Sequence, residues 1–377
     1  MNKMHRFSGL LALTLVLTLL CGGLCGCDKK EVEEKLTKGL TSGEYVYTRS
    51  DTYNTASISK YKGAATELEL PKTLDNLPVT GIDNDAFAEN KTLKKIVLPS
   101  TVKKIGDGAF KNCTALISAK VGDSVETVGN YAFSGCTALT AIALPDVTTT
   151  IGSNAFSCCT ELKNIILGKG IASVGFDAFY GTAWFASLTD EFVIVGDGVL
   201  IDYNGDGKKV EVPKEVKKIA SAFVNNLNVQ SVVLPDGMTQ VDDNAFQGCT
   251  ALNNITIPDS VTSIGSYAFA RCISLSGITI PESVTEIGAQ AFYSCISLKS
   301  VEIPASIKTI SEKAFSDCSG LSRVVFTKGI ASIEKEAFSG CGGLNVVAFS
   351  GKKADWERVK IAEGNETLSN ALLNCAE

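Results

Sequence analysis

The sequence predicts a solenoid, in which copies of one short turn stack into an elongated domain, and three observations indicate this. An Ala-Phe pair recurs every 23 residues in two series, from Phe87 to Phe179 and from Phe223 to Phe338. The residues between successive Ala-Phe pairs repeat one apolar pattern. Eight of the nine prolines lie at one position of this pattern, directly after two apolar residues that are separated by a single residue. A fixed period of this length means that a turn buries its apolar side chains only when a neighbour stacks on it.

Each turn is predicted to contain one short strand. In the turn that begins at Phe246, Ile255 and Ile257 flank a polar residue and are followed by Pro258. Such alternation is typical of a half-buried strand, and proline ends the strand because it lacks an amide donor. About eleven turns are expected, each beginning at one of the repeated phenylalanines: Phe87, Phe110, Phe133, Phe156, Phe179, Phe223, Phe246, Phe269, Phe292, Phe315 and Phe338.

Composition favours one elongated folded domain. The 377 residues are 45% hydrophobic and 20% charged, so the chain is neither disordered nor strongly charged. The formal net charge of −6 disfavours nucleic acid and anionic membrane surfaces as partners.

The first residues resemble an export signal. Residues 1–26 place Lys3 and Arg6 before an apolar run, a pattern typical of a removable signal peptide. The motif Leu24-Cys25-Gly26-Cys27 resembles the bacterial lipobox, which predicts lipidation at Cys27; an ordinary cleaved signal is the alternative. Residues 27–43 are then expected to be a flexible tether.

The remaining chain is expected to contain four parts. Residues 44–181 are a first block of turns with an N-terminal cap, and 182–213 are a hairpin insertion that interrupts the period. The insertion resembles the N-terminal cap, because Tyr61 to Pro71 aligns without gaps with Tyr203 to Pro213, which predicts a bend or seam. Residues 214–350 are a second block, and 351–377 are a C-terminal cap in which Trp356 covers the last turn or, alternatively, stacks on a ligand.

The repeated residues resemble the BspA-like bacterial leucine-rich repeats, whose turn follows Ala-Phe-x-x-Cys-x-x-Leu-x-x-Ile-x-Ile-Pro-x-x-Val-x-x-Ile-Gly. The resemblance covers roughly residues 44 to 375. It implies a leucine-rich-repeat solenoid of short parallel strands with short helical or irregular convex segments. It also implies an exported surface protein with a role in adhesion to host matrix proteins or other cells, without naming a ligand.

Cysteine recurs three residues after the repeated phenylalanine, and histidine is absent beyond His5. Without imidazole, histidine-dependent nucleophiles and histidine-ligated zinc are excluded from the chain beyond the signal. Regular cysteines suggest either disulfides or a structural ladder of reduced thiols; stacked parallel side chains favour the ladder. The ladder comprises Cys113, Cys136, Cys159, Cys249, Cys272, Cys295, Cys318 and Cys341, with Asn90, Thr182 and Asn226 in the other turns, and any reactive thiol is expected at Cys158 or Cys375.

Two further patterns have alternative interpretations. The segment Asp202 to Gly207 resembles the first half of a calcium loop, but Pro213 occupies the twelfth position and a simple turn is favoured. Asn365-Glu-Thr367 fits a glycosylation sequon, to which we assign no role in a bacterial lipoprotein. No cofactor or metal is expected.

The outward position between the two apolar residues at the strand end is the candidate binding face. A parallel β-helix enzyme that cleaves polysaccharides would need paired carboxylates there, and the position offers only Glu302. Its small, β-branched residues suit a protein ligand, or simply a strand. We call these positions the outward stripe: Val97, Lys120, Ala143, Ile166, Val233, Thr256, Thr279, Glu302, Val325 and Ala348.

The expectation is therefore a non-enzymatic, lipid-anchored leucine-rich-repeat protein at a bacterial cell surface that binds a protein partner. A ligand-free envelope scaffold and a carbohydrate-active β-helix enzyme are the alternatives. The sequence leaves the ligand, the oligomeric state and the membrane leaflet open.

Overall fold

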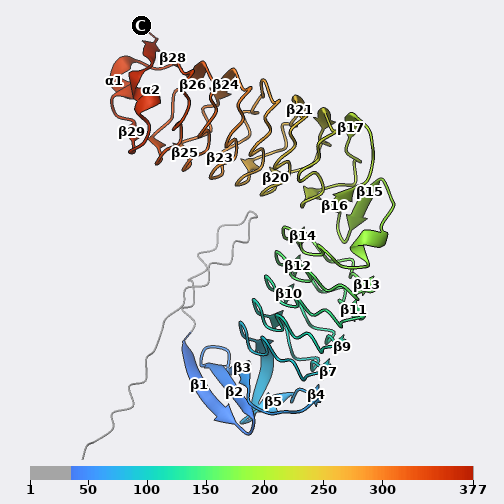
Figure 1. Cartoon of the computed structure of the whole chain (residues 1–377). Helices are drawn as coiled ribbons and strands as arrows, with labels where there is room; N and C mark the ends of the chain where they lie inside the picture. The colour runs from blue at the N-terminus through green and yellow to red at the C-terminus, as the bar shows by residue number, and fades with distance from the viewer. Residues whose placement is uncertain (1–34, 377) are drawn as a thin grey trace, which may run out of the picture. The chain divides into compact units, whose positions relative to one another are not determined.

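The computed structural model describes residues 35–376, which form two compact units (Figure 1). The first unit comprises 35–168 and 177–187, and the second comprises 169–176 and 188–376. The predicted signal peptide 1–26 and the lipidation site Cys27 lie outside the described residues.

The first unit opens with a cap of antiparallel strands. Strands β1 (Leu36–Ser42), β2 (Tyr45–Ser50) and β3 (Thr55–Tyr61) form a meander, and β3 pairs in parallel with β6 (Leu77–Ile82). β5 (Thr73–Leu74) pairs with β6. The prediction of a tether over 27–43 is therefore wrong for 36–42. Leu36 and Leu40 and the Ser42-Gly43 turn suit a hairpin edge, although charged residues surround them.

Two parallel ladders follow in the first unit, and they lie on different sides of it (Figure 1). β8 (Lys104–Ile105), β10 (Thr127–Val128) and β12 (Thr150–Ile151) continue from β6. The other ladder contains β4 (Glu67–Glu69), β7 (Lys95–Val97), β9 (Ser118–Lys120), β11 (Ala141–Ala143) and β13 (Asn164–Ile166). Partners such as Ile96 and Ala119 are 23 residues apart, so one sequence repeat equals one turn.

The second unit repeats this arrangement. Its hairpin of β15 (Phe192–Val195) and β16 (Val199–Tyr203) pairs in parallel with β18 (Lys218–Ile219). One side carries β17 (Lys209–Glu211), β19 (Ser231–Val233) and β21 (Asn254–Thr256), then β24 (Ser300–Ile303), β26 (Arg323–Phe326), β28 (Val346–Phe349) and β30 (Leu372–Cys375). The other side carries β20 (Gln240–Val241), β22 (Ser263–Ile264), β23 (Glu286–Ile287), β25 (Thr309–Ile310), β27 (Ser332–Ile333) and β29 (Lys360–Ile361). Strand β14 (Ser173–Val174) also belongs to this unit.

Stacked phenylalanine rings form the centre of each unit. In the first unit the ring centroids of Phe87 and Phe110 are 5.0 Å apart, and the series continues to Phe179. In the second unit it runs from Phe223 to Phe338 at 5.0–5.5 Å. All are buried, and burying a phenylalanine side chain contributes about 1.5–3 kcal/mol. Each turn covers the interior side chains of its neighbour and excludes solvent from them. This arrangement confirms the predicted solenoid.

Backbone hydrogen bonds also join the turns at the phenylalanine. The N–H of Phe110 donates to the carbonyl of Ala132 at 2.7 Å, and Phe133 repeats this with Ala155. This segment is a run of tight turns without helix. Within the described residues, helix occurs only as η1 (Phe185–Ser187), α1 (Lys353–Trp356) and α2 (Glu366–Asn370). Of the two convex geometries expected, the irregular one is therefore present in the turns.

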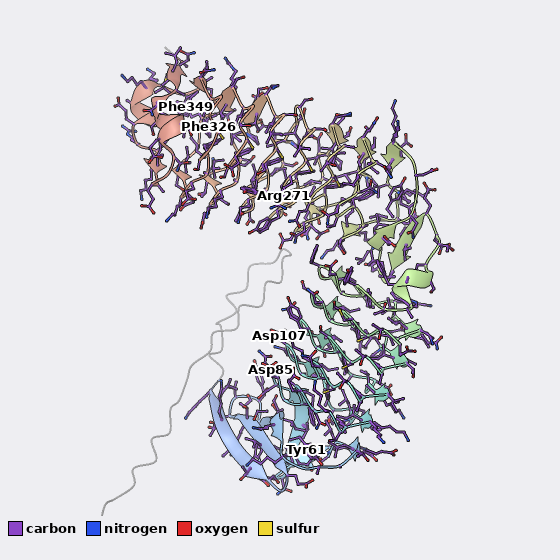
Figure 2. All side chains as sticks on the ribbon, viewed as in Figure 1. Tyr61, Asp85, Asp107, Arg271, Phe326 and Phe349 are labelled. Atoms are coloured by element: carbon purple, nitrogen blue, oxygen red, sulfur yellow. The ribbon has the colours of Figure 1, made fainter. Side chains whose placement is uncertain are left out.

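The hairpin of the second unit has the same role as the N-terminal cap of the first. Tyr61, labelled in Figure 2, stacks on Phe87 at 5.8 Å, and Tyr203 packs on Phe223 at 5.1 Å. The hydroxyl of each tyrosine lies where a Cβ on Gly63 or Gly205 would be, so both positions require glycine. The gap-free alignment of the two segments thus corresponds to one cap structure that the chain uses twice.

Trp356 covers the last turn of the second unit. Its ring lies 5.3 Å from that of Phe326 and 5.4 Å from that of Phe349, both labelled in Figure 2. Because its ring packs on the buried core, Trp356 has the structural role that the sequence favoured.

Candidate functional site

The outward stripe of the first unit lies on four paired strands. Val97 is opposite Lys120 on β7 and β9, and Ala143 is opposite Ile166 on β11 and β13. The intervening residues Ile96, Ala119 and Ile142 point inward and are buried. Period-two alternation thus presents the stripe to solvent, and Ile166 is 67% exposed.

In the second unit the stripe is interrupted. Val233 is opposite Thr256 on β19 and β21, and Glu302, Val325 and Ala348 are in register on β24, β26 and β28. Thr279 lies between these two groups in a segment without strand structure. The expectation of a continuous sheet surface is therefore wrong at this turn. Gly277 begins the segment, and glycine weakens a strand because it adds backbone entropy and packs no side chain.

The chemistry of the stripe follows from its outward residues. Lys120, Ala143, Thr256, Thr279 and Glu302 are exposed. Val233 is 41% exposed, and Val97, Val325 and Ala348 are half-buried. A rigid ladder therefore displays small and β-branched side chains. Such a surface suits shape-matched contact with another polypeptide better than bond-making chemistry.

The repeated cysteines form two buried columns and make one specific hydrogen bond each. The Sγ of Cys136 donates to the carbonyl of Phe110 at 3.1 Å, and Cys272 does the same with Phe246. Each thiol thus reaches the phenylalanine of the preceding turn. All ten cysteines in residues 35–376 are free thiols, including the two columns Cys113, Cys136, Cys159 and Cys249, Cys272, Cys295, Cys318, Cys341.

Burial keeps the thiols of the second column, from Cys249 to Cys341, protonated. It raises the pKa of Cys249 and of Cys341 to about 12, and raises the pKa values of Cys272, Cys295 and Cys318 well above their ordinary range. A protonated thiol is a donor and a poor nucleophile. The columns therefore join turns together. Cys158, by contrast, is exposed, and Cys375 is partly exposed.

Turns without the cysteine use a side-chain oxygen to bond the same loop. The Oδ1 of Asn90 accepts the N–H of Leu93 at 2.9 Å, and that of Asn226 accepts the N–H of Val229. The hydroxyl of Thr182 donates to the carbonyl of Phe179 and accepts the N–H of Phe185. These residues are local caps of the loop rather than ligands.

The calcium-like segment is a turn. Asn204 uses its amide nitrogen to donate to the carbonyls of Leu188 and Asp190, at 3.5 and 3.1 Å. Asp202 accepts the N–H of Tyr203. These bonds close the end of the hairpin. Within residues 35–376, no group of three or more acidic, cysteine or histidine side chains is arranged to hold a metal ion.

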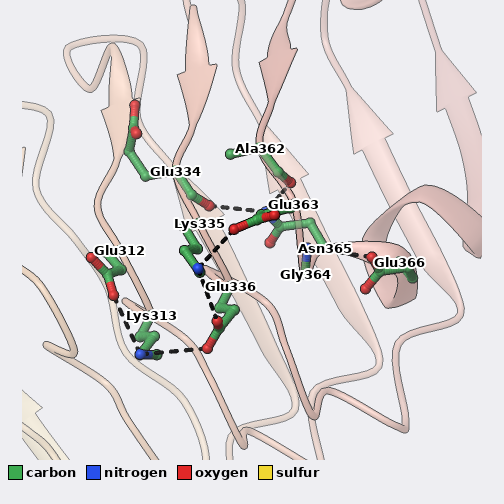
Figure 3. Close-up of polar contacts among 10 residues, drawn as sticks. All are labelled: Glu312, Lys313, Glu334, Lys335, Glu336, Ala362, Glu363, Gly364, Asn365 and Glu366. Carbon is green, nitrogen blue, oxygen red and sulfur yellow. Dashed lines mark hydrogen bonds and ion pairs between the residues drawn. The ribbon is translucent and has the colours of Figure 1, made fainter.

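The C-terminal cap contains two structural side chains that the sequence analysis had not assigned, Asn365, drawn in Figure 3, and Thr367. The buried Asn365 accepts the N–H of Phe338 and donates to the carbonyls of Glu334 and Ala362, each at 2.9 Å. The hydroxyl of Thr367 donates to the carbonyl of Phe338, as a ladder cysteine does in earlier turns. The glycosylation-like triplet therefore replaces the missing next turn.

An exposed charge network borders this cap. The Nζ of Lys313 lies 3.3 Å from the Oε1 of Glu312 and 3.4 Å from the Oε2 of Glu336. The Nζ of Lys335 lies 2.7 Å from the Oε1 of Glu363 (Figure 3). The Lys335 ammonium lowers the pKa of Glu363, and Glu312 together with Glu336 raises that of Lys313. Because the groups are exposed, the pairs contribute little to stability.

The fold and the stripe together define a leucine-rich-repeat solenoid with a displayed strand surface. The family model described as BspA type leucine rich repeat region matches six copies over residues 65–191, 203–267 and 217–345. The chain belongs to this family. No curated protein matches the sequence. No described helix is long and apolar enough to cross a membrane.

Several solved structures are similar to this chain. A leucine-rich cell surface protein from Faecalibacterium prausnitzii A2-165 is 25% identical over 85% of this chain and 97% of its own, with a TM-score of 0.42. A leucine-rich repeat protein from Bacteroides ovatus is 21% identical over 90% of this chain and 100% of its own, at 0.39. Pneumococcal vaccine antigen PcpA is 18% identical over 91% and 97%, at 0.46.

Proposed function

We propose that this protein is an exported, lipid-anchored and non-enzymatic surface protein that binds a protein partner through the outward stripe. The single observation that supports binding is the register of the stripe. Backbone ladders fix its side chains, and Ile166 and Val233 remain substantially exposed. A preorganised surface loses little conformational entropy on binding.

Export and anchoring rest on the first residues. The basic and apolar pattern of 1–26 and the motif before Cys27 support a lipoprotein signal. The variant Cys27→Ala should leave the membrane fraction of the producing bacterium. An unchanged membrane fraction would refute lipid anchoring and leave the binding proposal intact.

The absence of a carboxylate dyad supports the non-enzymatic role. Glu302 is opposite Val325 on the next strand, so its carboxylate has no acidic partner along the stripe. Incubation with a panel of polysaccharides should release no new reducing ends. Release of sugar fragments would replace the proposal with a carbohydrate-active enzyme.

The binding proposal is tested with the chain from Asp28 onward, which retains β1. Its partner is first captured by cross-linking on intact cells, with host matrix proteins and cell-wall glycans as purified probes. The triple substitution Val233→Lys, Thr256→Lys and Thr279→Lys places bulky charge on the stripe and should weaken capture while thermal unfolding stays nearly unchanged.

A matched control uses the other ladder of the same turns. Thr239→Lys, Thr262→Lys and Thr285→Lys add equal charge at exposed positions and should preserve capture. Capture that survives the stripe substitution would show that the assigned face is wrong. Failure to capture any protein would favour a ligand-free scaffold.

A further inference from the structure

The outward side of β7, β9, β11 and β13 in the first unit is basic, although the whole chain is acidic. Lys94 and Lys95 lie at the start of β7, Lys120 ends β9, and Lys163 precedes β13. No aspartate or glutamate lies within these four strands, whereas β4, at the edge of the ladder beside β7, carries Glu67 and Glu69. The chain has a formal net charge of −6, so this face opposes the average charge of the molecule. We call it the basic face, defined by these four lysines together with Ile117 and Ile166.

Part of this positive charge is not neutralised within the structure. Lys95 pairs with Glu67 at 2.8 Å, and Lys163 pairs with Glu161 at 3.2 Å. Lys94 and Lys120 are exposed and form no ion pair within the described part of the chain. Two ammonium groups therefore remain available to an external carboxylate.

Exposed apolar side chains lie among these charges. Ile117, one residue before β9, is 44% exposed, and Ile166, the last residue of β13, is 67% exposed. Strand β11 lies between β9 and β13 and presents only Ala141 and Ala143 outward. The large side chains of Ile117 and Ile166 therefore lie on either side of β11, whose outward alanine side chains are short. Apolar surface that gathers on one face and is bordered by polar residues marks an interaction site.

The corresponding face of the second unit has different chemistry. Its charges have both signs, with Lys209 and Glu211 on β17, Glu302 on β24 and Arg323 on β26, and β19 and β21 between them are uncharged. A partner selected by charge would therefore distinguish the two faces. Complementary charge contributes mainly to association rate and specificity.

We infer that the basic face recognises an acidic, extended protein segment whose carboxylates meet Lys94 and Lys120 and whose apolar side chains cover Ile117 and Ile166. This inference rests on the proposed function and names the chemistry of its partner. A purely polyanionic ligand would use the lysines and leave both isoleucines exposed to water, so the two isoleucines favour a protein segment.

The test uses the chain from Asp28 onward and immobilised peptide probes of one length. One probe alternates leucine with glutamate, a second alternates leucine with lysine, a third alternates serine with glutamate, and heparin is the fourth probe. The leucine-glutamate peptide should bind best. The double variant Lys94→Glu and Lys120→Glu should weaken that binding roughly tenfold, and raising the salt from low to physiological concentration should weaken it in the unmodified protein.

The matched control is Lys62→Glu with Lys104→Glu, which makes the same change in net charge at exposed lysines elsewhere in the first unit. It should retain binding within about twofold. Ile166→Ser should also weaken binding of the leucine-glutamate peptide and leave heparin unaffected.

Two results would overturn the inference. Equal binding of the serine-glutamate peptide or of heparin would mean that the face is a general polyanion site. Preference for the leucine-lysine peptide, or no effect of the double variant, would remove the charge argument. Both outcomes concern the basic face of the first unit and are separable from the proposed function, whose capture test substitutes Val233, Thr256 and Thr279 in the second unit.

Discussion

The side-chain oxygen of Asn365 lies 2.9 Å from the backbone nitrogen of Phe338, where earlier turns place the alanine carbonyl of the next turn. Phe315, for example, donates to Ala337 at 2.8 Å. One asparagine therefore substitutes for backbone that the array no longer supplies, and it ends the solenoid without an orphaned donor.

The variant Asn365→Ala should open the last turns. It removes three hydrogen bonds and leaves the N–H of Phe338 buried without a partner. We expect a loss of about 2–4 kcal/mol, because each unsatisfied buried group costs about 1–3 kcal/mol. Hydrogen exchange should show the loss in β27, β28 and β30, since solenoid stability is a nearest-neighbour property.

Asn374→Ala is the control, because Asn374 lies at an exposed position of β30 in the same cap. It should leave exchange rates in these strands nearly unchanged. Equal protection in the Asn365 variant would mean that water or a shifted loop replaces the side chain, and the capping role would be rejected.

Thiol labelling should separate the two classes of cysteine. In the chain from Asp28 onward, Cys158 should react first and Cys375 next, because they are the described thiols that solvent reaches. The eight ladder cysteines should stay unlabelled until the protein is unfolded. Since burial raises the pKa of Cys249 and Cys341 to about 12, raising the pH to about 9 should not expose them to the reagent.

Mass spectrometry of labelled peptides is the measurement. Rapid native labelling of Cys249 or Cys272 would contradict the buried ladder. The variant Cys272→Ala should lower stability by about 1–3 kcal/mol, because it removes both the hydrogen bond to Phe246 and buried volume.

The structural features that recur in many turns were predictable from the sequence, whereas the features that occur only once were missed. Phe110 and Cys136 have equivalents in many turns, so their stacking and burial follow from the period. The strand β1 and the role of Asn365 arise at the ends of the array, where no second copy shows what the residue replaces. The break at Thr279 was visible only as Gly277, and one glycine does not decide whether a strand forms.

Contacts between turns were also hidden, because they join residues 23 positions apart. A Cβ on Gly135 would meet the Oδ1 of Asn112, and the φ of Gly135 is +72°. Gly248 and Gly340 have the same relation to Asn225 and Asp317. Two residues after the phenylalanine, an Asx side chain in one turn is therefore matched by glycine in the next.

The variant Gly135→Ala tests this rule. It should lower stability by about 1–2 kcal/mol from the left-handed conformation alone, and further from the contact with Asn112. In an Asn112→Gly background the additional cost should disappear, which a double-mutant cycle in urea unfolding measures. Strict additivity of the two substitutions would contradict steric coupling between the turns.

The carboxyl group of Asp242 makes the first turn of the second block sensitive to pH. It accepts the N–H of Ile219 at 2.9 Å and a hydrogen bond from Gln240, and burial raises its pKa above the ordinary value of 3.8. A raised pKa means that the folded state holds the proton more tightly than the unfolded chain. The resulting stabilisation is complete below pH 3.8 and is lost as the pH rises through the raised value.

The variant Asp242→Asn should remove this dependence, because the amide keeps an acceptor for Ile219 and does not ionise. We expect the difference in unfolding free energy between the two proteins to change as the pH rises above 3.8, with the unmodified protein losing more stability. Asp243→Asn is the control, since Asp243 is exposed and accepts the N–H of Ser266. Parallel pH profiles for all three proteins would show that Asp242 ionises equally in the folded and unfolded states, and that burial does not govern its charge.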